Sequence, residues 1–100
     1  MPAFTMVDSG LIAIRRNDRQ ILLLSHPRDP RRRVGLTLSA SVDQGKTWVQ
    51  HKELNDDGAN YSDLVPLNDG TIGLLYGNGA SAHTGFPVRF IRFNLEYLGL

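Results

Sequence analysis

Residues 41–48 read S-V-D-Q-G-K-T-W and lie between two runs of alternating apolar residues that are typical of β-strands. At such a place the carboxylate of Asp43 can accept backbone N–H bonds, and Gly45 can adopt the positive φ that other residues resist. The hydroxyls of Ser41 and Thr47 can add bonds to the same turn, and the Trp48 ring can fold back over the hairpin. The stretch therefore predicts a tight turn that joins two antiparallel strands.

Outward from this turn, the chain reads as short strands separated by polar or glycine-rich turns. A first group of strands is expected at residues 11–14, 20–25, 33–41 and 47–54, and a second group at residues 61–67, 71–76 and 88–93. Asn68-Asp69-Gly70 is typical of a hairpin turn within the second group. Asn94 is placed to cap a final short turn through Leu98. The pattern predicts an all-β chain.

Burial is also readable from these runs. Residues 21–24 are all apolar, which indicates a strand that is buried on both faces. Residues 33–41 alternate, which indicates a half-buried strand. Residues 26–32 contain Pro27 and Pro30 and are expected to form a loop, because proline cannot donate to a ladder.

Composition fits a packed domain and excludes several classes of function. Hydrophobic residues make up 41% of the chain, and the formal net charge is +1, so disorder is not expected and nothing favours nucleic acid or a membrane surface as partner. The chain has no cysteine, which rules out disulfides and thiolate metal sites. No apolar run approaches the roughly 20 residues of a membrane helix, and residues 1–10 lack the pattern of a signal peptide. Localisation stays open.

A four-stranded antiparallel meander is the blade of a β-propeller. Four strands followed by three match the C-terminal end of a propeller in which one strand of the last blade comes from elsewhere. We therefore expect residues 1–100 to form one partial propeller domain, with one blade at residues 11–54 and an incomplete final blade at residues 59–98. Repeat architectures need about three or more units to bury their faces, so the chain is expected to be a fragment or to associate.

Three blocks of sequence sharpen this interpretation. They are Ser25-His26-Pro27, then Arg33-x-x-Leu36-Thr37-Leu38 leading into residues 41–48, and then Asn60-Tyr61-Ser62-Asp63-Leu64-Val65 with Asp69-Gly70-Thr71-Ile72-Gly73-Leu74-Leu75-Tyr76. In order and spacing, over residues 20–98, they resemble the C-terminal part of bacterial exo-α-sialidases, and residues 41–48 resemble the Asp box (BNR repeat) of that family. The resemblance implies about one and three-quarter blades of a six-bladed propeller.

For function, the resemblance implies a retaining glycoside hydrolase that removes terminal α-linked sialic acids from glycoconjugates with a tyrosine nucleophile. Tyr61 matches the nucleophile, and Arg33 matches one of three arginines that grip the substrate carboxylate. A phenol suits this reaction because a carboxylate nucleophile would be repelled by the carboxylate on the anomeric carbon. A guanidinium fork suits a planar carboxylate. Without the resemblance, Tyr61 would be an ordinary strand tyrosine and Arg33 one residue of the basic run 31–33.

The chain departs from the family pattern at two positions and lacks several groups. Gly77 stands where the family usually has a glutamate that holds an active-site arginine, and Gly35 stands where it usually has asparagine. The other arginines, the aspartic acid/base and the glutamate that activates the tyrosine lie upstream in the family. The remaining carboxylates are expected to be solvated turn and edge residues: Asp8, Asp18, Glu53 and Asp63. No metal-ligand spacing is found among the histidines, which are expected at the surface: His26, His51 and His83.

These departures leave three alternatives. The first is a segment of a sialidase. This segment is expected to be inactive alone, to need missing propeller blades or self-association, and to use no metal or cofactor. The second alternative is a non-catalytic Asp-box propeller piece that binds glycan or protein, which Gly77 would favour. The third is a stand-alone β-sheet protein that dimerises through its open edges. The parent family is often secreted or periplasmic.

Overall fold

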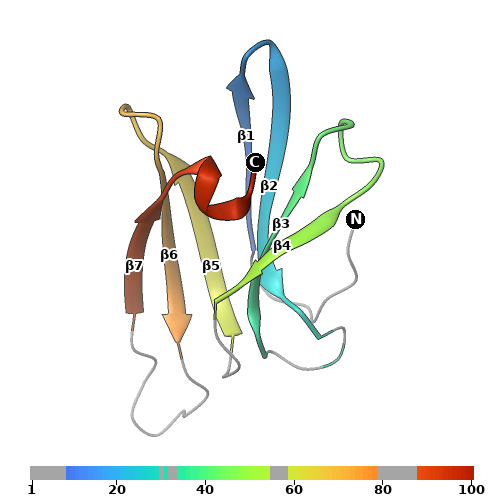
Figure 1. The fold of residues 1–100 in the computed structure, drawn as a ribbon. Helices are drawn as coiled ribbons and strands as arrows, with labels where there is room; N and C mark the ends of the chain where they lie inside the picture. The colour runs from blue at the N-terminus through green and yellow to red at the C-terminus, as the bar shows by residue number, and fades with distance from the viewer. Residues whose placement is uncertain (1–8, 30, 32–33, 55–58, 79–87) are drawn as a thin grey trace, which may run out of the picture.

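Two antiparallel sheets lie against each other in the computed structural model of the chain (Figure 1). The structure describes residues 9–29, 31, 34–54, 59–78 and 88–100. Among them, no helix has the length and apolar character needed to cross a membrane.

The first sheet is a meander of four strands in sequence order. Its strands are β1 (Gly10–Arg16), β2 (Arg19–Pro27), β3 (Leu36–Ser41) and β4 (Val49–Glu53). Arg16 pairs with Arg19 across the first hairpin, so Asn17 and Asp18 alone form its turn. Both residues have positive φ, 52° and 64°, as the two-residue hairpin turn that matches strand twist requires.

The second sheet is a three-stranded meander. Its strands are β5 (Ala59–Pro66), β6 (Ile72–Asn78) and β7 (Val88–Phe93). A short 3-10 helix, η1 (Leu95–Leu98), follows β7, and the Asn94 side chain caps it by accepting a hydrogen bond from the Tyr97 backbone N–H. The cap predicted at Asn94 is therefore confirmed.

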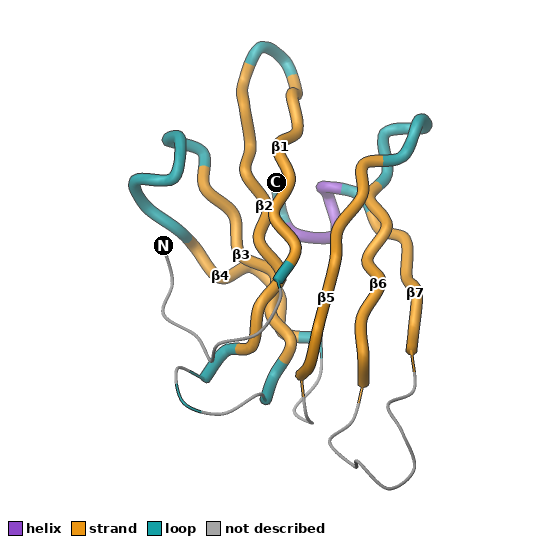
Figure 2. The backbone as a smooth tube through the Cα atoms, turned by 180° about the vertical axis from the view of Figure 1, so that it is seen from behind, coloured by secondary structure: helices purple, strands orange, loops and turns teal. Residues whose placement is uncertain are grey.

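The core lies between the two sheets, where the inward faces of both contribute leucine and isoleucine. Leu23 and Leu38 from the first sheet and Leu74 from the second are fully buried there, and Leu64 of β5 packs with them. Strand β5 lies beside β1 and β2, and β1 and β5 run in the same direction (Figures 1 and 2). The starts of β1 and β5 consequently lie at the same end of the molecule.

The C-terminal residues tie the two sheets together in two places. The Arg16 guanidinium donates to the Leu100 carbonyl at 3.1 Å and to the Glu96 carboxylate at 2.9 Å. The Lys52 ammonium of β4 lies 4.6 Å from the centre of the Tyr97 ring, within the range of a cation–π interaction. These contacts join residues of the first sheet to η1.

Three expectations from the sequence need correction. Strand β2 extends through His26 and Pro27, which pair with Thr37 and Leu36, so these residues are strand and not loop. Pro27 is tolerated because it is the last residue of the ladder. His26 is fully buried and not at the surface. Strand β3 is buried along its whole length and not only on its apolar face.

The second face of β3, whose burial the alternating pattern did not predict, is polar. Its side chains form hydrogen bonds. The ring nitrogen Nδ1 of His26 lies 2.6 Å from the Pro27 carbonyl, and Nε2 lies 2.7 Å from Ser39 Oγ. Because a carbonyl can only accept, Nδ1 carries the proton and Ser39 donates to Nε2. Thr37 donates to the Gly35 carbonyl at 2.9 Å. Polar residues can be buried on this face because each has a partner.

Candidate active site

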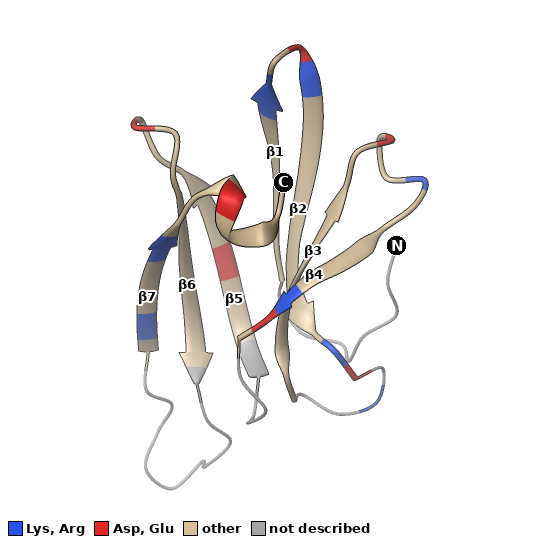
Figure 3. Cartoon of the chain, in the orientation of Figure 1, with Lys and Arg blue, Asp and Glu red and all other residues tan. Residues whose placement is uncertain are grey.

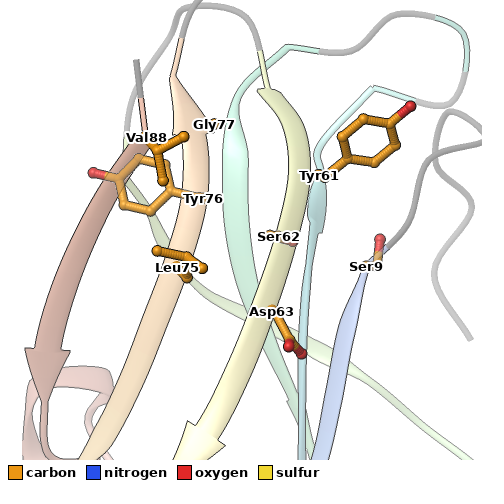
Figure 4. Close-up of a pocket in the computed structure, with 8 residues that line it drawn as sticks. All are labelled: Ser9, Tyr61, Ser62, Asp63, Leu75, Tyr76, Gly77 and Val88. Carbon is orange, nitrogen blue, oxygen red and sulfur yellow. The ribbon is translucent and has the colours of Figure 1, made fainter. Parts of the chain in front are cut away.

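An open depression of about 430 Å³ lies at the end of the molecule where β1 and β5 begin (Figure 4). Its lining comes from three strands and the residue before β1: Ser9, Tyr61, Ser62, Asp63, Leu75, Tyr76, Gly77 and Val88. Figure 4 shows Tyr61 and Ser9 on one side of β5, and Leu75, Tyr76 and Val88 on the other. The depression therefore has the exposed Tyr61 phenol at its rim and, on the other side of β5, a wall formed by Leu75, Val88 and a second phenol, Tyr76.

Tyr61 lies at an irregularity of β5. Ala59 pairs with Asn78 and Ser62 pairs with Tyr76, so three steps along β5 are matched by only two along β6. One extra residue in one strand is a β-bulge, which locally bends the strand and re-aims a side chain. The Tyr61 side chain is 55% exposed, and its hydroxyl points away from β5 (Figure 4). A ligand in the depression could reach this oxygen.

Asp63 provides a carboxylate two residues after Tyr61, on the same exposed side of β5. Its Oδ1 accepts a hydrogen bond from the Leu64 backbone N–H at 3.0 Å. Asp63 is the only charged side chain among the described residues that line the depression. Figure 3 shows the other charged residues mainly at hairpin ends, along β7 and in η1. The described part of the depression is therefore negative, and an anionic ligand would need cations from another segment.

Arg33 lies outside the described residues, but the residues next to it are well held. The Arg28 backbone N–H donates to the carbonyls of Val34 and Gly35 at 3.0 and 2.9 Å. Gly35 has φ +71°, and a Cβ there would lie 2.4 Å from Arg28 Nε. Glycine at position 35 is thus explained by a left-handed backbone packed against the Arg28 side chain.

The turn between β3 and β4 lies at the opposite end of the molecule from the depression (Figure 1). Asp43 Oδ1 accepts hydrogen bonds from the Thr47 backbone N–H and from Ser41 Oγ, both at 2.8 Å. The Thr47 hydroxyl donates to Oδ2. Hydrogen bonds from Thr47 and Ser41 lower the pKa of Asp43 to about 2. The Asp43 carboxylate makes these hydrogen bonds within the turn, so its role is structural and it is not part of the depression.

Two further bonds close the same turn. The Gly45 backbone N–H donates to Ser41 Oγ at 2.8 Å, and Trp48 Nε1 donates to the Gly45 carbonyl at 3.0 Å. Gly45 has φ +89°, and the preceding Gln44 also has positive φ, at 64°. These bonds are the ones that the residue types predict for this stretch.

A contact between the two sheets next to Tyr61 could not be found from the sequence. Ser25 Oγ of β2 lies 2.8 Å from Ser62 Oγ of β5, and both residues are buried. The Gly10 backbone N–H donates to Ser25 Oγ at 3.0 Å. Serine and glycine are common in strands and turns alike, so no local signal marks this contact. Among the described residues, no group of three or more His, Cys, Asp or Glu is arranged to hold a metal ion.

Comparison with known proteins places these features in context. No protein-family model matches the chain. A sialidase of Micromonospora viridifaciens is 39% identical over 80 residues, which cover 80% of this chain and 11% of that protein. A sialidase of Bacteroides fragilis (strain YCH46) is 34% identical over 85 residues, which cover 78% of this chain and 15% of that protein. The chain therefore spans a small part of the length of the relatives it matches.

A solved structure shares the fold. The intramolecular trans-sialidase from Ruminococcus gnavus, crystallised in complex with oseltamivir carboxylate, superposes with a TM-score of 0.72 at 21% sequence identity. The match covers 94% of this chain and 23% of that chain. The prediction of an all-β chain built from antiparallel propeller blades is confirmed by this likeness and by the two sheets.

Proposed function

Because this chain is a segment of the bacterial sialidase family, we propose that it supplies part of the active site of an exo-α-sialidase. In this proposal the assembled protein hydrolyses terminal α-linked sialic acids from glycoconjugates with retention of configuration. Tyr61 is the nucleophile and Arg33 holds the substrate carboxylate. The observation that carries the proposal is the bulge that turns the half-exposed Tyr61 toward the depression at the start of β5.

The chemistry of the substrate favours a phenol at this place. The anomeric carbon of a sialoside bears a carboxylate, which would repel a second carboxylate brought up as nucleophile. In the proposed first step the Tyr61 oxygen bonds to the anomeric carbon and the bond to the leaving oxygen breaks. The phenolic proton goes to a base, and the leaving oxygen takes a proton from an acid. In the second step water replaces the phenolic oxygen and configuration is retained overall.

Most of the supporting groups must come from outside the described residues. The depression holds one carboxylate, Asp63, and no described cation, so it cannot bind the anionic substrate by itself. Arg33 would supply one bidentate clamp, and the remaining arginines, acid and base would come from other blades. The second sheet also presents apolar side chains to solvent that other blades or a second copy could cover: Val65, Leu75, Val88 and Phe90. We therefore propose that the chain alone does not turn over substrate.

A second function is favoured by one observation. Gly77 lines the depression where the family usually has a glutamate, so the described wall there has no carboxylate to orient an arginine. A propeller that binds a glycan or a protein without hydrolysing it would tolerate this loss.

Hydrolysis of a fluorogenic sialoside tests the proposal. In the protein that carries this segment with its remaining blades, Tyr61→Phe should lower kcat on the order of 10³-fold or more, because the proposed nucleophile is removed. Tyr97→Phe is the matched control, because it removes the same hydroxyl from a ring that is 43% exposed and lies in η1, outside the depression. It should leave kcat unchanged. The purified 100-residue chain should show no turnover.

Each other outcome has a distinct meaning. Equal rates for Tyr61→Phe and the unaltered protein would remove Tyr61 from the mechanism. A folded, full-length protein that binds sialoside without hydrolysing it would favour the binding function. Turnover by the chain alone that disappears in Tyr61→Phe would show that a complete site assembles by self-association.

A further inference from the structure

The buried contact between Ser25 and Ser62 lies directly behind the depression. Ser62 is the residue after Tyr61, and its side chain points to the opposite face of β5, as neighbouring strand residues do. It meets Ser25 of β2 at 2.8 Å between the two oxygens. Ser25 is completely buried and Ser62 is 8% exposed, so water does not compete for this contact.

The backbone of β1 completes the contact. The Gly10 N–H donates to Ser25 Oγ, so this oxygen accepts from β1 and lies within hydrogen-bond distance of the hydroxyl of β5. A Cβ at Gly10 would lie 2.6 Å from the Leu64 nitrogen and 2.9 Å from the Asp63 Cα. Three strands, β1, β2 and β5, therefore meet at Ser25, one residue away from the bulge that carries Tyr61.

We propose that Ser25 and Ser62 are positioning residues for the nucleophile, which fix the start of β5 against the first sheet and so hold Tyr61 over the depression. This inference rests on the proposed function of Tyr61. At the bulge, β5 has one more residue than β6. The pairing of β5 with β6 alone therefore does not determine where Tyr61 lies. The buried hydroxyl pair sets it, because sliding β5 by one residue would separate Ser62 Oγ from Ser25 Oγ and leave the Ser62 hydroxyl buried away from this partner, while Ser25 Oγ would keep the Gly10 N–H.

Apolar side chains at positions 25 and 62 would not fix the register of β5 in this way, because apolar contacts have no preferred direction. Replacing both serines by alanine removes the two hydroxyls together, but it also leaves the Gly10 N–H without the Ser25 oxygen, so some stability is lost. It also removes the directional side-chain contacts that join β2 to β5 at this level. The consequence expected of a positioning contact is therefore a loss of kcat that is larger than the loss of stability explains, since a displacement of about 1 Å of a reacting group can cost 10²-fold.

A double-mutant cycle tests this inference in the protein that carries the segment with its remaining blades. Ser62→Ala and Ser25→Ala should each lower kcat by about 10- to 100-fold with KM changed little. The double variant should lose no more than Ser25→Ala alone, because that variant already removes the contact with Ser62. Ser39→Ala is the matched control: it removes a hydroxyl that is equally buried and bonded to His26, but that faces away from β5. It should lower thermal stability and leave kcat unchanged.

A second measurement uses the 100-residue chain and needs no activity. With ¹³C-labelled tyrosine, Ser62→Ala should shift or broaden the ring signals of Tyr61 and leave those of Tyr97 in place. Losses of kcat that add in the double variant, or that appear equally in Ser39→Ala, would overturn the positioning role. So would unchanged Tyr61 signals. If Tyr61→Phe keeps full activity, the proposed function fails; if it abolishes activity while Ser62→Ala does not lower kcat, only the present inference fails.

Discussion

The turn between β3 and β4 and the depression at the start of β5 lie at opposite ends of the molecule and are held in different ways. Every side-chain bond that closes the turn joins residues at most four apart in the chain, within residues 41–48. The contact behind the depression joins residues 37 apart, Ser25 and Ser62, and residues 15 apart, Gly10 and Ser25. The turn can form as soon as its two strands pair, whereas the contact between Ser25 and Ser62 forms only when the two sheets have docked.

Glycine shows the same contrast. Gly10 is required by space, because backbone atoms of β5 occupy the position that a side chain would take. Gly45 is required by conformation, because its φ is +89° while the nearest atom to an added Cβ, in Leu22, lies 3.7 Å away. One glycine allows two sheets to approach each other and the other allows a chain to reverse direction.

Gly10→Ala should therefore have the largest effect on stability. The added methyl group would overlap the Leu64 nitrogen and Asp63 Cα, which cannot move without displacing β5. We expect a loss of about 3 kcal/mol in the free energy of unfolding, measured by urea denaturation. Trimming Ser25 to alanine in the same chain should not restore stability, because the overlap is with backbone. Recovery in that double variant would show that the two sheets are not held as closely as described.

Gly45→Ala should have a smaller effect, of about 1 kcal/mol, because it strains one backbone residue and displaces nothing. Gly45→Asn should recover part of this loss, since asparagine tolerates positive φ better than alanine does. Urea denaturation of the two variants side by side measures the difference. A loss for Gly45→Ala as large as that for Gly10→Ala would contradict the distinction between the local turn and the docked sheets.

The contrast also explains how much was predictable from the sequence. The turn could be predicted because its residue types and spacing specify its bonds, whichever sheet it belongs to. The hairpin at Asn68-Asp69-Gly70 and the cap at Asn94 are local in the same sense. In each case the partners lie within a few residues, so pattern and chemistry suffice.

The burial of His26 and the pairing of Ser25 with Ser62 could not be predicted in this way. His26 precedes a proline, which suggested a loop, but the strand continues because Thr37 and Leu36 of β3 pair with His26 and Pro27. The alternation along β3 suggested one polar face in water, but Thr37, Ser39 and Ser41 are buried. Which polar residues find partners depends on the docked structure, and the roles proposed for Tyr61 and Arg33 depend on groups outside the described residues.

Lowering the pH should destabilise the two regions at different pH values, and the loss of stability should be smallest near neutral pH. Burial lowers the pKa of His26 below its usual 6.5, so the folded chain keeps this ring neutral where the unfolded chain takes up a proton. Stability from this group is complete above pH 6.5 and falls as the pH drops below it. Hydrogen bonds from Thr47 and Ser41 lower the pKa of Asp43 from 3.8 to about 2, so its contribution persists until the pH falls below 3.8.

Amide hydrogen exchange across a pH series, corrected for intrinsic rates, measures both windows. Protection near His26, at Thr37 and Ser39 of the adjoining strand, should weaken as the pH falls below 6.5, while the Gly45 and Thr47 amides stay protected relative to their neighbours until below pH 4. His26→Gln should abolish the loss of protection below pH 6.5, since an amide side chain takes up no proton. Asp43→Asn should abolish the loss of protection below pH 4. Simultaneous loss of protection in both regions near pH 6 would mean that the turn has no independent stability and depends on the buried histidine.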